Sequence, residues 1–333
     1  MKKKINYIIL FIVTILVLYF SLKDNFNEII NQIVNMNIFY LMVAFLLLII
    51  FWIFRSYPMY SFSKKINKEF TYLDSIILTL RTQFFNAVTP FATGGQPYQI
   101  YYLKNKNIDY ASSTSIVLEN FIVYQVALVL LGLIALFTNK MFNVFNNNDL
   151  LQELIALGFI VNTLVIVIMF IVAFSKKMNK RIIDFAIKVL TKLHIVKDET
   201  KKREEWDENI NRFHKSASIL LLDKKNFIFN IICNLIALSS LYLIPLMLLY
   251  SMGDFKSLTP LNGIITSAYV MLIGSFVPIP GGTGGLEYGF MSFYGNFIKG
   301  SKLNAIMLIW RFITYYFGII IGSLALNIKG DKK

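Results

Sequence analysis

Long apolar runs alternate with short polar links along this chain. Six runs, interrupted by few charges, come close to or exceed the ~20 residues that a helix needs to cross a bilayer. They are residues 5–22, 38–54, 115–137, 154–174, 227–250 and 305–328. The first run follows three lysines, as a signal peptide would, but it is too long for the apolar region of one and has no small-x-small cleavage site. We therefore predict six full membrane spans.

Composition agrees with this pattern, because 56% of the residues are hydrophobic and the mean hydropathy is +0.60. The sequence predicts an all-α polytopic membrane protein, and no segment is long or polar enough to form a separate soluble domain. The single cysteine, Cys233, excludes an internal disulfide and a cysteine-based metal cluster. His194 and His214, the two histidines, lie apart in a polar segment. We therefore expect no metal, no cofactor and no catalytic residue.

A repeated motif breaks two of the hydrophobic segments. The pattern Pro-x-x-Thr-Gly-Gly occupies residues 90–95 and again residues 280–285, in a chain with only 7 Pro and 17 Gly. Helix breakers at membrane depth are tolerated only where protein or a water-filled cavity satisfies the freed backbone groups. A pair of broken segments in corresponding halves points to the substrate site of a transporter.

Charge gives the orientation of the spans. The connector 176–225 carries 14 Lys and Arg, which places it in the cytoplasm. Residues 75–103 then begin and end on the cytoplasmic face, residues 261–300 on the external face, and both chain termini are cytoplasmic. We predict a first repeat over 1–137, an external loop over 138–150, a second repeat over 151–328 and a cytoplasmic tail over 329–333.

Each predicted repeat contains two spans, a re-entrant segment and one more span, and the two repeats have opposite orientations. Such an inverted repeat suits alternating access around a site at the middle of the membrane. The alternative is that each broken segment crosses the membrane as two short half-helices.

Within the connector, residues 178–190 place Ile182, Ala186 and Leu190 on one helical face, with Ile183 and Ile187 beside them. Charged residues occupy the remaining positions. This pattern predicts an amphipathic helix that lies at the membrane interface. The net charge of +14 is compatible with binding to anionic headgroups and equally with the ordinary cytoplasmic bias of basic loops.

The glycine-rich corners are the first candidate site, because glycine permits close backbone approach and N–H groups at a helix start favour anions. A lipid phosphate is the expected ligand. Tight helix packing through small residues is the alternative. The candidate residues are Thr93, Gly94, Gly95 and Gln96 in the first corner, and Thr283, Gly284 and Gly285 in the second.

Four charged residues complete the candidate site. Glu119 lies in an apolar span, where a carboxylate costs about 2.5–3.5 kcal/mol, so we expect it to meet Arg311 of the last span. That pair is either a substrate or proton-coupling element or a structural salt bridge. Glu287 faces a cationic headgroup, carries a proton, or only complements its helix dipole. Arg81 binds phosphate or extends to the interface.

The strings at 89–97 (TPFATGGQP) and 278–287 (PIPGGTGGLE) resemble the two signatures of the lysylphosphatidylglycerol synthase/flippase transmembrane family. The resemblance implies a multi-pass protein of the bacterial inner membrane that handles lipids, in the best-known case by moving aminoacylated phosphatidylglycerol between leaflets. Full-length synthases carry a further C-terminal cytosolic domain for lysyl transfer. Because this chain ends at Lys333, directly after its last span, the resemblance favours lipid translocation over aminoacyl transfer.

We therefore expect a lipid translocase whose partner is a membrane phospholipid, either anionic or aminoacylated. Two alternatives stay open. One is a phosphatidylglycerol lysyltransferase, and the other is a membrane subunit that assembles with a separate lipid-modifying synthase. No nucleic-acid motif accompanies the basic charge, so no direct nucleic-acid partner is expected.

Overall fold

The computed structural model describes residues 26–142, 144–145, 149–192, 199–275 and 277–328. Throughout these ranges the regular secondary structure is helical, without strands. Five stretches are long and apolar enough to cross a membrane, and these are Ile38–Ile66, Tyr110–Phe142, Leu151–Phe174, Lys224–Ser251 and Ser301–Leu326. They coincide with five of the six predicted spans, and the run at 5–22 lies outside the described residues. The chain is thus an all-α, multi-pass membrane protein.

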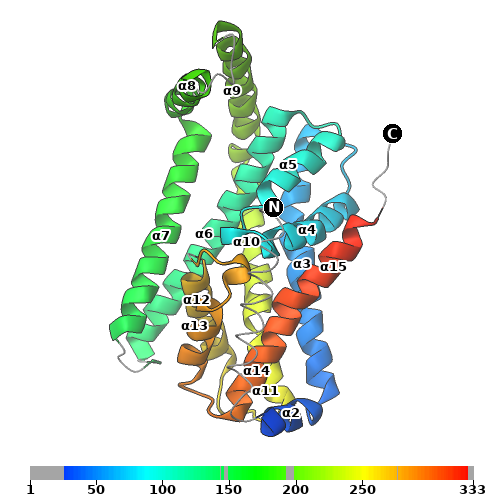
Figure 1. The fold of residues 1–333 in the computed structure, drawn as a ribbon, viewed down its shortest axis with the longest axis vertical. Helices are drawn as coiled ribbons and strands as arrows, with labels where there is room; N and C mark the ends of the chain where they lie inside the picture. Colours follow the sequence, from blue (N-terminus) through cyan, green and yellow to red (C-terminus); the bar gives the residue numbers. More distant parts are fainter. Residues whose placement is uncertain (1–25, 143, 146–148, 193–198, 276, 329–333) are drawn as a thin grey trace.

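Three of these spans are single helices, namely α3 (Ile38–Ile66), α6 (Tyr110–Phe142) and α7 (Asp149–Phe174). A fourth joins α10 (Lys224–Tyr242) to α11 (Ile244–Ser251), which starts with Pro245 in its first turn, where a proline costs no helical hydrogen bond. Figure 1 shows α3, α6, α7 and α10 extending along the long axis of the molecule. The short helix α2 (Phe26–Val34) packs against the last span.

The last span changes its helical geometry in the middle. It consists of α14 (Ser301–Arg311), a π-helical turn η3 (Phe312–Tyr316) and α15 (Phe317–Leu326). In the turn, the N–H of Phe317 donates to the carbonyl of Phe312, five residues earlier. Beyond it, α15 packs closely on α4, since a Cβ at Gly322 would lie 2.7 Å from the carbonyl O of Leu80.

Two helical hairpins lie between the spans, each interrupted at the repeated motif as the sequence predicts. The first comprises α4 (Tyr72–Ala87), η1 (Pro90–Ala92) and α5 (Gly95–Asn105). The second comprises α12 (Pro260–Gly274), η2 (Pro280–Gly282) and α13 (Gly285–Tyr294). In both, the second helix folds back against the first. Figure 1 places α5 in the upper part of the molecule and α13 in the lower part.

An ion pair closes the open end of each hairpin. In the first, Asp74 near the start of α4 accepts from Lys106, just after α5, at 2.8 Å. In the second, Asp254 in the segment ahead of α12 accepts from Lys302, in the first turn of the following helix α14, at 3.1 Å. The two hairpins therefore share both the motif at the bend and the kind of tie at the ends.

The basic connector forms α8 (Lys176–Lys192) and α9 (Glu199–Leu221), which project beyond the bundle at the upper end of Figure 1. The predicted amphipathic segment 178–190 falls within α8, although nothing is described for the side chains of Ala186 and Leu190. Figure 1 shows α8 lying across the end of α7 rather than continuing it.

The main core fills the space among α3, α6 and α10–α14. Inside a membrane, such helices are held by close packing and internal hydrogen bonds rather than by a hydrophobic effect. Phe290 stacks on Trp310 with ring centroids 4.7 Å apart, while the buried hydroxyl of Tyr294 lies 2.7 Å from Ser267 Oγ. This core packs α12 and α13 behind the second motif.

Candidate functional site

The two copies of the motif begin with the same backbone. We refer to residues 89–97 as the first corner and residues 279–287 as the second corner. After each motif proline, two consecutive residues are left-handed. In the first corner these are Phe91 and Ala92, both at φ 53°, and in the second they are Gly281 at 67° and Gly282 at 62°. The repeated sequence therefore folds into a repeated turn.

The motif threonines make the same hydrogen bond in both corners. Thr93 Oγ1 donates to the carbonyl of Pro90 at 2.9 Å, and Thr283 Oγ1 donates to the carbonyl of Pro280 at 2.9 Å. Each bond closes the turn by binding the threonine side chain to the carbonyl of the motif proline. This explains why a threonine recurs at that position of the motif.

The corners diverge at the next peptide, between threonine and glycine. In the first corner, ψ of Thr93 is −12° and φ of Gly94 is −74°, whereas in the second corner ψ of Thr283 is 139° and φ of Gly284 is 89°. A change of nearly half a turn in ψ, together with a change of similar size in the following φ, turns one peptide plane over. The N–H of this peptide consequently points in different directions in the two corners.

Its hydrogen-bond partner explains the difference. The N–H of Gly94 donates to Thr89 Oγ1 at 2.8 Å, and the N–H of Gly284 donates to Glu287 Oε2 at 2.6 Å. The position of Thr89 is occupied in the second corner by Ile279, which has no acceptor, and the position of Glu287 is occupied in the first corner by Pro97. Each corner thus has one side-chain acceptor for the N–H of the Thr-Gly peptide. It precedes this peptide in the first corner, as Thr89, and follows it in the second, as Glu287.

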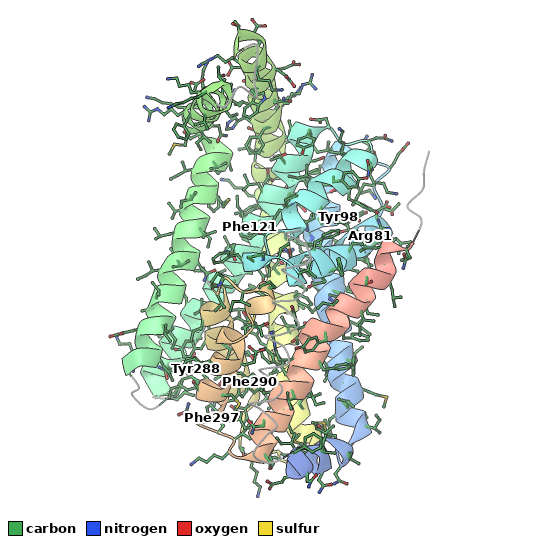
Figure 2. All side chains as sticks on the ribbon, in the orientation of Figure 1. Arg81, Tyr98, Phe121, Tyr288, Phe290 and Phe297 are labelled. Carbon is green, nitrogen blue, oxygen red and sulfur yellow. The ribbon has the colours of Figure 1, made fainter. Side chains whose placement is uncertain are left out.

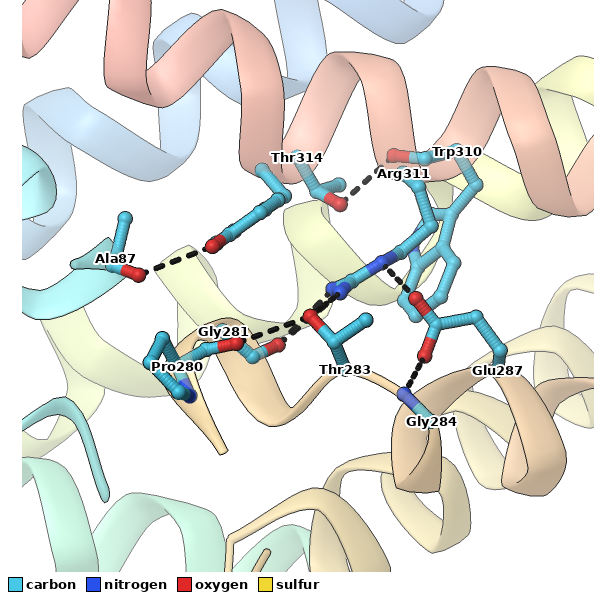
Figure 3. A network of polar contacts seen from close by, with 10 residues as sticks. Ala87, Pro280, Gly281, Thr283, Gly284, Glu287, Trp310, Arg311 and Thr314 are labelled. Atoms are coloured by element: carbon cyan, nitrogen blue, oxygen red, sulfur yellow. Dashed lines mark hydrogen bonds and ion pairs between the residues drawn. The ribbon is translucent and has the colours of Figure 1, made fainter. Parts of the chain in front are cut away.

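Arg311 of α14 holds the second corner (Figure 3). Its Nε lies 2.7 Å from Glu287 Oε1, and both terminal nitrogens donate to the carbonyl of Gly281 at 3.2 Å. One of them also donates to Thr283 Oγ1 at 3.2 Å, and the guanidinium lies 4.6 Å from the ring centroid of Tyr315. Because Arg311 is only 4% exposed and Glu287 7%, this ion pair is shielded from solvent.

The two corners meet. The turns η1 and η2 contact each other, and the hydroxyl of Tyr315 in the last span donates to the carbonyl of Ala87 at the end of α4 at 3.0 Å. Figure 3 shows this bond beside the Arg311 network. The two motif threonines differ in their surroundings, because Thr93 is exposed while Thr283 is buried.

The motif glycines serve two different purposes. A Cβ at Gly94 would lie 2.6 Å from Thr89 Cγ2, and a Cβ at Gly95 or Gly285 would clash with Asn86 or Val277, respectively. Gly284 has open space around it and is required instead for its φ of 89°. Gly94, Gly95 and Gly285 are therefore sites of close packing, which was the alternative prediction from the sequence, and Gly284 is not. The half-buried Gln96 follows them in the first turn of α5.

The predicted pairing of Glu119 with Arg311 is wrong, because Arg311 pairs with Glu287. Glu119 is fully buried in α6, where its Oε1 accepts from Ser115 Oγ at 2.9 Å, and its Oε2 has no hydrogen-bond partner among the described residues. The adjacent Asn120 accepts from Arg55 of α3 at 2.9 Å. Glu119 thus bonds within its own helix, and the hydrogen bonds of the corners do not include it.

Arg81 has a role that the sequence does not reveal. Its Nε donates to the carbonyl of Ala325 at 2.9 Å and one terminal nitrogen donates to the carbonyl of Ile328 at 2.6 Å. The other reaches the hydroxyl of Tyr98 at 3.3 Å, and Figure 2 shows Arg81 and Tyr98 together near the end of α15. The guanidinium therefore caps the carbonyl end of the last helix.

A metal centre finds no support in the part of the chain that the structure describes, where no three His, Cys, Asp or Glu side chains gather in a way that could hold an ion. Nε2 of His214 in α9 lies 3.1 Å from Nδ2 of Asn179 in α8. His194 lies outside the described residues.

The described chain is thus a helical membrane bundle in which two hairpins, broken at the same motif, meet beside a buried ion pair. The family model for the lysylphosphatidylglycerol synthase TM region matches residues 7–322, so the chain belongs to this family. It is also similar to a UPF0104 membrane protein of Archaeoglobus fulgidus. The two are 26% identical over 302 residues, which cover 86% of this chain and 85% of that protein.

Proposed function

We propose that this protein moves phospholipids between leaflets, with the headgroup passing the junction of the two corners while the acyl chains stay in the bilayer. The substrate is an anionic or aminoacylated phospholipid, such as phosphatidylglycerol or its lysyl derivative. The observation that carries the proposal is the buried ion pair of Arg311 and Glu287 at the point where both hairpins meet.

The chemistry of this pair fits such a headgroup. A guanidinium binds phosphate oxygens with paired hydrogen bonds, and a carboxylate binds an ammonium group. Arg311 already faces oxygen acceptors from Gly281, Thr283 and Glu287, so a lipid phosphate would replace one set of oxygens by another. Glu287, once released, would be free to accept the amino group of an aminoacylated lipid.

The shared features of the two hairpins support the inverted repeat that the sequence predicts. Both bend at the same motif, both close their open ends with an Asp–Lys pair, and α5 and α13 lie in different parts of the molecule. In this proposal the cytoplasmic connector and termini place the first hairpin on the cytoplasmic side of a bacterial cell membrane and the second on the external side. Alternating access would then open one corner at a time.

The test is lipid movement in proteoliposomes. Fluorescent phosphatidylglycerol and lysylphosphatidylglycerol are reconstituted with the purified chain, and the fraction of probe that a membrane-impermeant quencher reaches is followed over time. We expect protein-dependent extra quenching that is lost in Gly94→Val and Gly284→Val. In the first, the Cβ lacks space, and in the second, a β-branched residue is forced to positive φ.

Gly318→Ala is the matched control, since this glycine lies in the last span with nothing within 4 Å of an added Cβ and no unusual φ. Size-exclusion profiles of all variants verify that they remain folded. Normal transport by both valine variants would remove the corners from the proposal. Movement of neither lipid, combined with co-purification of a lipid-modifying synthase, would favour the subunit alternative.

A further inference from the structure

Helix α8 presents three different faces, and α9 covers only the first. On that face Ile187 is fully buried and Asn179 contacts His214 of α9. Asp184 accepts from Arg203 of α9 at 2.6 Å, and Lys180 lies 3.4 Å from Asp207. These contacts fix the rotation of α8 about its own axis.

The second face is apolar and exposed. Met178, Ile182, Phe185 and Val189 follow one another at intervals of a helical turn, and Phe185 is 71% exposed. With 3.6 residues per turn, this stripe lies on the opposite side of α8 from Ile187. The single apolar stripe expected from the sequence is therefore divided into a part covered by α9 and a part that nothing covers among the described residues.

The third face is basic and adjoins the exposed stripe. Lys177, Arg181, Lys188 and Lys192 are all exposed, and their helical positions lie between the α9 contact and the apolar stripe. An apolar stripe bordered by Lys and Arg is the pattern of helices that lie in the plane of a membrane surface. Figure 2 shows nitrogen-tipped side chains gathered around this end of the molecule.

The position of α8 indicates what covers the stripe. The helix begins two residues after the end of α7, whose apolar stretch Leu151–Phe174 is long enough to span a membrane. The last residue of that stretch, Phe174, is exposed, as a lipid-facing side chain would be. Since α8 lies across the end of α7, it is held at the level where the bilayer ends (Figure 1).

We propose that α8 is a surface-bound helix that binds anionic phospholipids. The stripe at Met178, Ile182, Phe185 and Val189 inserts at the boundary between headgroups and acyl chains, and the basic row binds headgroup phosphates. Attraction of Lys and Arg to an anionic leaflet acts only within about a Debye length of the surface. A helix that lies on the surface keeps its basic row within that distance. This inference requires only that α7 spans the membrane and is independent of lipid transport.

The experiment uses the full chain in lipid nanodiscs, which leave both membrane faces accessible. Cys233 is the only cysteine and is buried, so Cys233→Ser provides a background for single labels. An environment-sensitive fluorophore is attached at Phe185→Cys and, as the matched control, at the exposed Glu208→Cys on α9. Quenching by aqueous iodide and by lipids spin-labelled near the headgroup is compared in phosphatidylcholine discs with and without phosphatidylglycerol.

We expect the label at position 185 to be quenched by the spin-labelled lipid and shielded from iodide, more strongly when phosphatidylglycerol is present. The label at position 208 should stay accessible to iodide in both lipids. The variant Lys177→Gln/Arg181→Gln/Lys188→Gln should abolish the dependence on phosphatidylglycerol. Iodide access at 185 equal to that at 208 would overturn the proposal. Shielding without quenching by lipid would overturn it as well, by indicating a protein contact.

Discussion

The first and second corners share a turn but are stabilised by different means. In the first, a neutral hydroxyl of Thr89 accepts from the Thr-Gly peptide and the motif threonine is exposed. In the second, the acceptor is Glu287, which is itself bound by Arg311 in a buried ion pair. The motif therefore sets the turn, while one residue on either side of it sets the orientation of the peptide and the polarity of the site.

The corners also differ in backbone strain. Left-handed residues other than glycine cost on the order of 1–3 kcal/mol each, and the first corner has two of them, Phe91 and Ala92. The second corner has glycines at both positions and bears little such strain. The first corner is therefore strained in its backbone, whereas the second depends on a desolvated ion pair.

Removing Arg311 should have the largest effect. Arg311→Met leaves Glu287 buried without its cation, and breaking a buried pair from one side costs about 3–5 kcal/mol. The corresponding change in the first corner, Thr89→Val, removes one neutral acceptor and should cost about 1 kcal/mol. Unfolding midpoints in detergent compare the two. Equal losses would contradict the contrast between a charged and a neutral corner.

Substitutions at the left-handed positions should change the stability of the protein by different amounts in the two corners. Gly281→Ala adds a Cβ that clashes with the ring of Tyr315 at positive φ, and we expect a loss of about 2–3 kcal/mol. Phe91→Gly relieves an unfavourable φ at an exposed position, so stability should change by less than about 1 kcal/mol. A larger loss for Phe91→Gly than for Gly281→Ala, in the same thermal unfolding assay, would refute this assignment.

Removing the ion pairs Asp74–Lys106 and Asp254–Lys302 should have the smallest effect on stability, and a similar one in both hairpins. Partial burial alone would raise the pKa of Asp254, but hydrogen bonds from Ser257 and Lys302 outweigh it and lower the pKa to about 2. The pKa of Asp74 is likewise lowered, because bonds from Lys106 and Thr71 outweigh its burial. A lowered carboxylate pKa stabilises the fold above the unfolded value of about 3.9, and this stability is lost as the pH falls through the folded value.

Asp254→Asn and Asp74→Asn should each cost about 1 kcal/mol at pH 7, since both pairs are near the surface. For Asp254 the difference from the wild-type chain should shrink between about pH 4 and pH 2. Thermal unfolding across this pH range measures it. A difference that stays constant down to the lowest pH would show that the ion pair is not its source.

Much of the fold is predictable from the sequence, because hydrophobic length and helix breakers are local properties. Five apolar runs and both broken segments appear where the pattern places them. Side-chain pairing is less accessible, because the rotation of a helix about its axis depends on its neighbours. Glu119 and Glu287 are both acids within apolar surroundings, yet only packing decides that the second meets Arg311. For Arg81, the partners lie 244 and 247 residues away and are backbone carbonyls, which leave no mark in the sequence.

The π-helical turn in the last span constrains the number of residues between Arg311 and Gly322. A wide turn holds one residue more than an α-helical turn, so it changes the angular phase between Arg311, which faces the second corner, and Gly322, which faces α4. Deleting a single residue between them would rotate the far half of the span by about 100° and bring a bulkier neighbour of Gly322 against α4. The number of residues in η3 is therefore constrained in addition to the identity of Tyr315, which donates to the carbonyl of Ala87. An insertion or deletion there should be tolerated less well than a substitution at the exposed Phe312.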